Sequence, residues 1–150
     1  MYRASKDGFR AVNFHRKCDD KTKTLTIIKS INKNIFGGYT DATWTSNNQY
    51  FQDPNAFLFS LVNHDHKPFK TNIFSNGQNA IYCHPSYGPT FGGGNDIHIS
   101  CNSNTNSDSY SNFGFSYKYP KYSYKTTKAK SILAGTYDFQ TVEIEVFAKI

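Results

Sequence analysis

Alternation of apolar and polar residues is clearest at the end of the chain, where it predicts a β-strand. Every second residue from 142 to 150 is apolar: Val142, Ile144, Val146, Ala148 and Ile150. Glu143, Glu145 and Lys149 occupy intervening positions. Because successive side chains of a strand point to opposite faces of its sheet, we predict a half-buried strand. Both glutamates should lie on its outward, solvated face.

Four earlier segments also have the composition of strands. Residues 25–31 are rich in β-branched side chains and lead through three polar residues into residues 35–40, so these two segments are predicted to pair as a hairpin. Residues 56–62 have apolar side chains on both faces and are expected to form a central strand. A short strand is expected at residues 80–84.

Residues 96–101 are predicted to form a further short strand. In that strand Ile97 and Ile99 should point into the core. The same alternation places Asp96 and His98 on the outward face. We therefore expect Asp96 and His98 to be exposed to solvent.

Residues 7–18 show helical spacing, because Ala11, Phe14 and Cys18 fall on one face at offsets of three and seven. Asp7 is expected to cap this helix. Several hairpins with one short helix predict a mostly β, α+β fold, in which two antiparallel sheets pack as a β-sandwich with short flanking helices. Aromatic residues make up 17% of the chain, so rings should fill much of the space between the sheets.

Composition narrows the class of protein. A length of 150 residues suits one domain with its own core, spanning residues 1–150. No apolar run reaches the roughly 20 residues that cross a bilayer, and the first residues lack a signal-peptide pattern. Three cysteines cannot all pair, and no Asn-x-Ser/Thr acceptor occurs. These features favour a reducing, intracellular and cytoplasmic location. The net charge of +6 permits an acidic partner without requiring one.

Several motifs occur together at Thr24–Ser30, Ile35–Thr40, Trp44, Asp53–Leu61 and Ser86–Gly92. With the closing segment they resemble the TLDc domain, the module of the oxidation-resistance proteins. The positions that match the family's motifs are Gly37, Gly38, Trp44, Asp53, Pro54, Asn55, Gly88, Pro89, Gly92, Glu143 and Glu145. The resemblance covers nearly the whole chain and is closest to members from protists, fungi and invertebrates. Residues upstream of Tyr2 that complete the family's first element are missing, so we expect that the chain was trimmed from a longer protein.

The resemblance implies the same sandwich and a role in protecting cells against oxidative damage. Several TLDc proteins engage the vacuolar proton-pumping ATPase, so the implied partner is a protein, with subunits of that ATPase as the first candidates. The family has no agreed active site. The sequence also shows no nucleophile with its base, no metal cage and no cofactor cradle. We therefore expect a non-catalytic protein-interaction module that uses no cofactor.

Residues 117–125 are the expected binding surface, because lysines and aromatic rings alternate there and aromatic residues often anchor protein interfaces. The residues concerned are Tyr117, Lys118, Tyr119, Lys121, Tyr122 and Lys125. The same mixture can contact phosphates and stack on bases, so a nucleic-acid-binding surface is one alternative. No recognised RNA- or DNA-binding motif accompanies it, which disfavours nucleic acid as the partner.

Cys18 supplies the enzymatic alternative, a thiol-dependent peroxide scavenger. An exposed thiolate can reduce peroxide and become a sulfenic acid, which Cys83 or Cys101 would then resolve. The neighbouring Arg16 and Lys17 favour the thiolate, whereas apolar residues on the same predicted helix face favour burial. The scattered histidines and cysteines lack the spacing of a zinc site, so no metal site is predicted.

Glycines mark two places where space or backbone conformation is restricted. Gly37 and Gly38 are expected where another segment approaches the backbone closely. The cluster at 92–94 precedes a predicted strand instead of a helix, so it does not indicate a phosphate-binding loop. Tight packing or a positive φ angle is the expected reason for this cluster.

Overall fold

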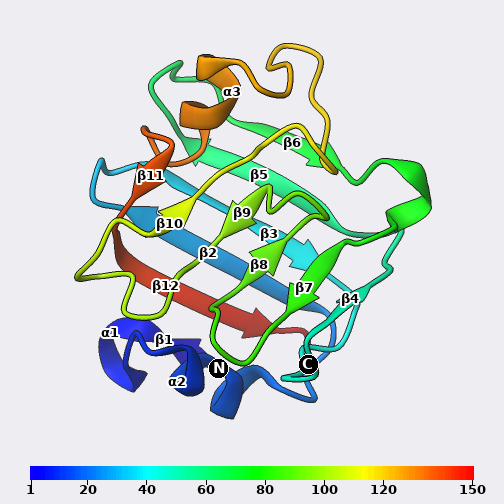
Figure 1. Cartoon of the computed structure of the whole chain (residues 1–150), viewed down its shortest axis with the longest axis vertical. Helices are drawn as coiled ribbons and strands as arrows, with labels where there is room; N and C mark the ends of the chain where they lie inside the picture. Colours follow the sequence, from blue (N-terminus) through cyan, green and yellow to red (C-terminus); the bar gives the residue numbers. More distant parts are fainter.

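Two six-stranded antiparallel sheets make up the computed structural model, which describes residues 1–150 (Figure 1). The strands of the first sheet, in spatial order, are β1 (Tyr2–Arg3), β12 (Thr141–Ala148), β2 (Thr24–Ser30), β3 (Ile35–Thr40), β5 (Phe57–Val62) and β6 (Phe69–Asn72). Those of the second sheet are β11 (Asp138–Phe139), β10 (Ser109–Tyr110), β9 (Ile97–His98), β8 (Thr90–Phe91), β7 (Ile81–Cys83) and β4 (Gln49–Phe51). Both sheets are open, with β1 and β6 as the edge strands of the first and β11 and β4 as those of the second. The predicted mostly β fold of two antiparallel sheets is confirmed.

The helices are short, and α-helices lie at both ends of the sandwich (Figure 1). They are α1 (Ala4–Asp7), α2 (Ala11–Cys18), α3 (Thr127–Ile132) and the 3₁₀ helix η1 (Ser75–Gly77). Figure 1 shows α1 and α2 at one end of the molecule and α3 at the opposite end. A membrane-spanning helix needs a length and an apolar composition that none of these helices has.

The helix predicted over residues 7–18 is divided in two. Gly8 has a φ angle of 105°, which ends α1 and leaves α2 to begin at Ala11. The prediction that Asp7 caps this helix is therefore wrong. Asp7 instead closes α1, where its Oδ2 accepts a hydrogen bond from the Arg3 backbone N–H at 2.9 Å.

The predicted hairpin of β2 and β3 is confirmed, with Thr24 opposite Thr40 and Lys29 opposite Ile35. Gly37 lies against the neighbouring strand so closely that a Cβ atom there would be 1.9 Å from the Thr26 carbonyl oxygen. The expected close approach of the backbones is thus observed. Any larger residue at this position would force β2 and β3 apart.

Aromatic rings fill the space between the sheets, as predicted. Trp44 is completely buried and contacts Phe14 and Phe91 edge to face, with ring centroids 5.2 and 5.6 Å apart. Its indole Nε1 donates a hydrogen bond of 2.8 Å to the hydroxyl of Thr24. The polar atom of this large side chain is therefore satisfied inside the core.

Two details of the first sheet differ from the predictions. A bulge between Thr141 and Glu143 shifts the register of β12, so Val142 is exposed, although Ile144 is buried as expected. In β5 the pairing with β6 ends at Ser60. Leu61, beyond that point, is exposed instead of meeting an apolar neighbour.

Candidate functional site

The residues of the family's central motif hold the fold together. The carboxylate of Asp53 is buried and accepts hydrogen bonds from the Thr40 hydroxyl at 2.7 Å and the Asp41 backbone N–H at 2.6 Å. It also accepts one from the backbone N–H of Asn55 at 2.9 Å. Asp53 therefore fastens the end of β3 to the turn that leads into β5. Because its oxygens are already occupied by the chain itself, a ligand site at this position is not indicated.

Gly88, Pro89 and Gly92 are likewise buried. Gly92 has a φ of 90°, and a Cβ atom there would be 2.0 Å from Oδ1 of Asp96. The expectation of tight packing with a positive φ is confirmed at this glycine. The cluster thus makes room for a buried carboxylate.

Asp96 is completely buried, so the prediction that it points to solvent is wrong. Strand β9 includes only Ile97 and His98, and Asp96 precedes it. Its carboxylate accepts hydrogen bonds from the backbone N–H groups of Gly114, Ser116 and Tyr117 at 3.0–3.2 Å. Burial raises the pKa of Asp96 to about 7, and these backbone donors oppose the increase. Asp96 therefore anchors the segment that leads to residues 117–125.

Glu143 and Glu145 were predicted to be solvated, and they are partly buried against the start of the chain. The Nε atom of Arg3 lies 3.2 Å from Glu143 and 3.3 Å from Glu145. Glu143 also accepts a hydrogen bond of 3.0 Å from the Ser5 backbone N–H. Partial burial opposes ionisation of Glu143, but hydrogen bonds from Ser5 and Arg3 outweigh it and lower its pKa. The closing motif thus fastens the N-terminal segment to β12.

Two of the three cysteines lie in surroundings that disfavour the thiolate. Cys18 is completely buried, and burial raises the pKa of its thiol to about 12. Burial also raises the pKa of Cys83, to about 11. Cys101 is less deeply placed, and none of the three forms a disulfide. No three His, Cys, Asp or Glu side chains come close enough together to hold a metal ion.

Residues 117–125 divide into a buried and an exposed part. Tyr117 is completely buried and donates a hydrogen bond of 2.7 Å to the Ala80 carbonyl oxygen. Tyr122 is also buried and donates one of 2.6 Å to Oδ2 of Asp65. The prediction that these two rings belong to an exposed binding surface is therefore wrong. They pack inward because the aromatic core extends to this end of the sandwich.

The remaining side chains of the segment join two phenylalanines that the sequence analysis did not single out. Lys118 Nζ lies 4.1 Å above the ring of Phe74, which is 55% exposed. Phe115 and Tyr124 are 46% and 39% exposed and pack edge to face at 5.4 Å. We call this group, together with Lys125, the Lys/aromatic surface. It combines apolar rings with ammonium groups at the outside of the molecule.

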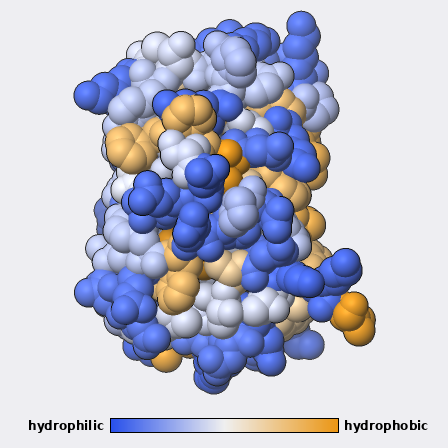
Figure 2. All heavy atoms as spheres, turned by 90° about the vertical axis from the view of Figure 1, so that its right-hand side faces the viewer, coloured by the Kyte–Doolittle hydropathy of each residue, from blue (hydrophilic) through white to orange (hydrophobic).

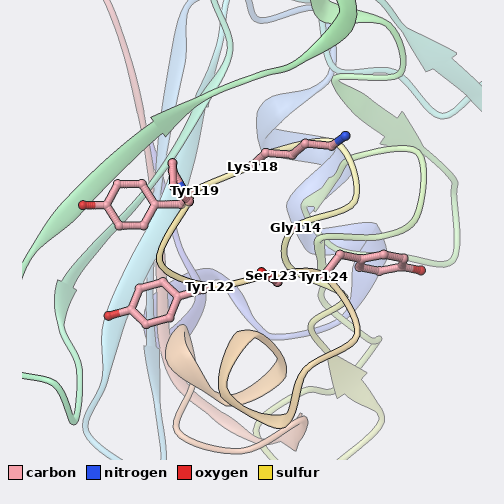
Figure 3. A pocket seen from close by; sticks show the side chains of 7 residues that line it. Gly114, Lys118, Tyr119, Tyr122, Ser123 and Tyr124 are labelled. Atoms are coloured by element: carbon pink, nitrogen blue, oxygen red, sulfur yellow. The ribbon is translucent and has the colours of Figure 1, made fainter.

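Two hollows adjoin the Lys/aromatic surface. The larger has a volume of about 370 Å³ and is lined by Gly114, Lys118, Tyr119, Pro120, Tyr122, Ser123 and Tyr124. Figure 3 shows that Tyr119 and Tyr122 point to one side of this segment, whereas Lys118 and Tyr124 point to the other. The smaller, of about 150 Å³, lies between Phe74 and Phe115. The segment predicted from the sequence therefore lines the larger of these two hollows.

Positive charge is concentrated in this region. Between Asp108 and Asp138 the sequence contains five lysines and no acidic residue. Asp65 forms ion pairs of 3.3 Å with Lys121 and Lys128. Lys118 and Lys125 contact rings instead of carboxylates. The absence of acidic residues over this stretch is the sequence signal that could have extended the predicted surface beyond residue 125.

On the side of the molecule that Figure 2 shows, the apolar groups are small and separate. Figure 2 shows the side that lies on the right in Figure 1, where hydrophobic residues are scattered among hydrophilic ones. Interfaces without a broad apolar face depend on a few anchor side chains surrounded by polar groups. The Lys/aromatic surface has the composition of such an anchor group.

Comparison with known proteins supports the family assignment. The sequence matches the TLDc domain family over residues 1–149. No curated protein shows a significant match to the chain. The match covers both sheets and all of the motif positions described above. The chain therefore belongs to the TLDc domain family.

Proposed function

We propose that this TLDc domain is a non-catalytic protein-interaction module that binds an acidic partner through the Lys/aromatic surface. The observation that supports it most is the pair formed by Phe74 and Lys118, an exposed ring beneath an ammonium group. A ring that becomes buried when a partner binds provides affinity, and an ammonium group beside it selects for carboxylates on the partner. The family implies a general oxidative-stress or interaction role, with which this proposal agrees.

The proposed partner is a subunit of the vacuolar proton-pumping ATPase, and the proposed setting is protection against oxidative stress. The partner's docking segment should carry Asp or Glu beside an apolar side chain, so that both Lys118 and Phe74 are matched. The unpaired lysines would accelerate association at low ionic strength, and salt would weaken it. The buried thiols give the peroxide-scavenger alternative less support than the interaction proposal.

A pull-down with the purified domain tests the proposal and can use a closely matched control. The test variant is Phe74→Ala with Lys118→Glu. The control is Phe57→Ala with Lys70→Glu, because Lys70 lies 4.0 Å above Phe57 in the same arrangement on the first sheet. Retention of vacuolar ATPase subunits, quantified by immunoblot, should fall at least about tenfold in the test variant only.

Two results would contradict the proposal. Equal loss of retention in both variants would show that the Lys/aromatic surface is not the specific site. Absence of every ATPase subunit from material retained by the wild-type domain would remove the proposed partner. Thermal unfolding of each variant would show whether a loss reflects binding or folding.

A further inference from the structure

A row of rings crosses the outer face of the second sheet. The aromatic row consists of Tyr50, Tyr82, Tyr87, His98, Tyr110 and Tyr137. Centroids of successive rings lie 4.4–6.1 Å apart. The row begins on β4 at one edge of the sheet and ends beside β11 at the other. Adjacent strands are separated by ~4.8 Å, so the row is on the order of 24 Å long.

The row faces away from the core. Tyr82 lies between Ile81 and Cys83, both buried, so alternation directs its ring outward. His98 also lies on the outer face, as the sequence predicted, but neighbouring rings cover it and leave it only 6% exposed. Figure 1 shows no helix in front of the second sheet. This face is therefore open to a partner.

The rings of the row meet at different angles and do not form one flat platform. Tyr50 stacks on Tyr82 at 26°, and His98 stacks on Tyr110 at 28°. Tyr87 meets His98 edge on, at 85°. Since the stacked faces cover one another, ring edges and hydroxyls are what a ligand would meet. A sugar, which packs flat against an uncovered ring face, would find few such faces here.

The row is electrically neutral along most of its length. Burial and the neighbouring phenols of Tyr82, Tyr110 and Tyr87 raise the pKa of Tyr50, with no ammonium or carboxylate among the causes. Burial, with a smaller effect of His84, lowers the pKa of His98 to about 4, so its imidazole is neutral at pH 7. These surroundings suit an uncharged ligand, although at the end of the row the Lys130 ammonium group lies 5.0 Å from the Tyr137 ring centroid.

Polar groups within the row remain available. The hydroxyl of Tyr110 accepts a hydrogen bond of 2.7 Å from Asn95 Nδ2, which leaves its own proton free to be donated. The Tyr50 hydroxyl makes only a long hydrogen bond of 3.3 Å to the Gly93 carbonyl oxygen. Nδ1 of His98 has no partner, although the side chain is more than nine-tenths buried. The Tyr82 hydroxyl is already engaged, because it donates a hydrogen bond to Asn48 Oδ1. The donors that the row can offer are therefore those of its other tyrosines, Tyr110 first among them.

We propose that the aromatic row binds a proline-rich segment of another protein in the polyproline II conformation. Such a segment has carbonyl oxygens without internal partners, and its prolines lack N–H groups, which complements a surface of hydroxyl donors. Proline-rich segments are also recognised by surfaces lined with aromatic side chains. At ~3.1 Å per residue, about eight residues would span the row.

Fluorescence anisotropy with fluorescein-labelled decaproline tests this proposal. The wild-type domain should bind saturably, and Tyr50→Ala and Tyr82→Ala should each weaken binding at least about tenfold. The matched control is Tyr39→Ala on the first sheet, where the ring stacks on Phe57 at 5.1 Å, and it should leave binding unchanged. Tyr110→Phe should weaken binding by a smaller factor, because it removes one donor and retains the ring.

Three results would overturn the proposal. They are no saturable binding of decaproline by the wild-type domain, equal binding by Tyr82→Ala, and tighter binding of cellohexaose than of decaproline. Circular dichroism of Tyr50→Ala, the most exposed position of the row, would establish that this variant is folded. The variant with Phe74→Ala and Lys118→Glu should still bind decaproline, so this inference and the proposed function can fail separately.

Discussion

The two sheets of the sandwich are built by different means. The first contains long strands, with eight residues in β12 and seven in β2, joined by long backbone ladders. In the second, four of the six strands have only two residues. Side-chain hydrogen bonds, such as those of Asp96, and ring contacts replace the missing ladder there. The stability of the first sheet therefore depends on long strands of alternating side chains and their backbone hydrogen bonds. That of the second depends on individual side-chain contacts.

This difference locates the candidate sites. Short strands leave long connecting segments, and loops on a rigid scaffold are where binding residues concentrate. The Lys/aromatic surface lies on such segments, and the aromatic row uses the outer face of the second sheet. The family motifs at Trp44, Asp53 and Glu143 instead secure the sandwich itself.

Removal of the Asp96 carboxylate should have the largest effect on the second sheet. Asp96→Ala would leave the backbone N–H groups of Gly114, Ser116 and Tyr117 unpaired inside the protein. We expect a loss of about 3–5 kcal/mol in the free energy of unfolding, measured by urea denaturation. Asp108→Asn, at an exposed position, is the control and should change stability little. A loss below ~1 kcal/mol for Asp96→Ala would refute its anchoring role.

A conservative truncation of one core side chain in the first sheet should lower the free energy of unfolding by less. Ile28 in β2 is completely buried, and Ile28→Val removes one methylene group. We expect a loss of about 1 kcal/mol in urea denaturation, without selective loosening of the second sheet. Amide exchange should distinguish the two changes, because Asp96→Ala should expose the amides of Ser116 and Tyr117 first. Equal exchange patterns in the two variants would contradict the contrast between the sheets.

The pH dependence of stability should separate Asp65 from Asp96. A hydrogen bond from Tyr122 and ion pairs with Lys121 and Lys128 lower the pKa of Asp65 below its ordinary 3.8. Its contribution is therefore present above pH 3.8 and is lost as the pH falls below that value. The pKa of Asp96 is raised to about 7, so protonation between pH 7 and 4 should have the opposite, stabilising sign.

Urea midpoints measured from pH 8 to pH 3 test this pair of signs. In Asp65→Asn the urea midpoint should fall less at acid pH than in the wild type, because the charge that pairs with Lys121 and Lys128 is removed. In Asp96→Asn the urea midpoint should depend less on pH near pH 7 than in the wild type. An equal fall of the urea midpoint at acid pH in Asp65→Asn and the wild type would show that other carboxyl groups cause that fall.

The smallest expected effect concerns peroxide. Cys18→Ser should leave peroxide consumption by the purified domain unchanged, because a buried thiol with a pKa of about 12 supplies almost no thiolate at pH 7. Consumption can be followed with a peroxide-sensitive dye against a buffer blank. A rate above buffer that is lost in Cys18→Ser would favour the enzymatic alternative.

Much of the first sheet could be predicted from the sequence. The strands at 25–31, 35–40 and 142–150 follow from β-branched runs and alternation, and their ends lie within two residues of those of β2, β3 and β12. The bulge before Glu143 could not be foreseen, because alternation of side chains says nothing about the backbone hydrogen bonds of a neighbouring strand.

The second sheet and the site were harder to predict for a physical reason. Strands of two residues are too short to show a period, so β8, β10 and β11 have no pattern in the sequence. Tyr117 and Tyr122 resemble exposed rings because lysines surround them, yet their hydroxyls find buried or partly buried acceptors. Phe74 and Phe115 joined the surface only through contacts that the fold creates.

Site-specific photocrosslinking tests the central claim most directly. A photoreactive phenylalanine analogue would replace Phe115 on the Lys/aromatic surface or, as a control, Leu61 on the first sheet, which is similarly exposed. After irradiation in cell extract, the account predicts a crosslink from position 115 to one acidic protein, and none from position 61. A crosslink to the same protein from position 61, with none from position 115, would contradict it.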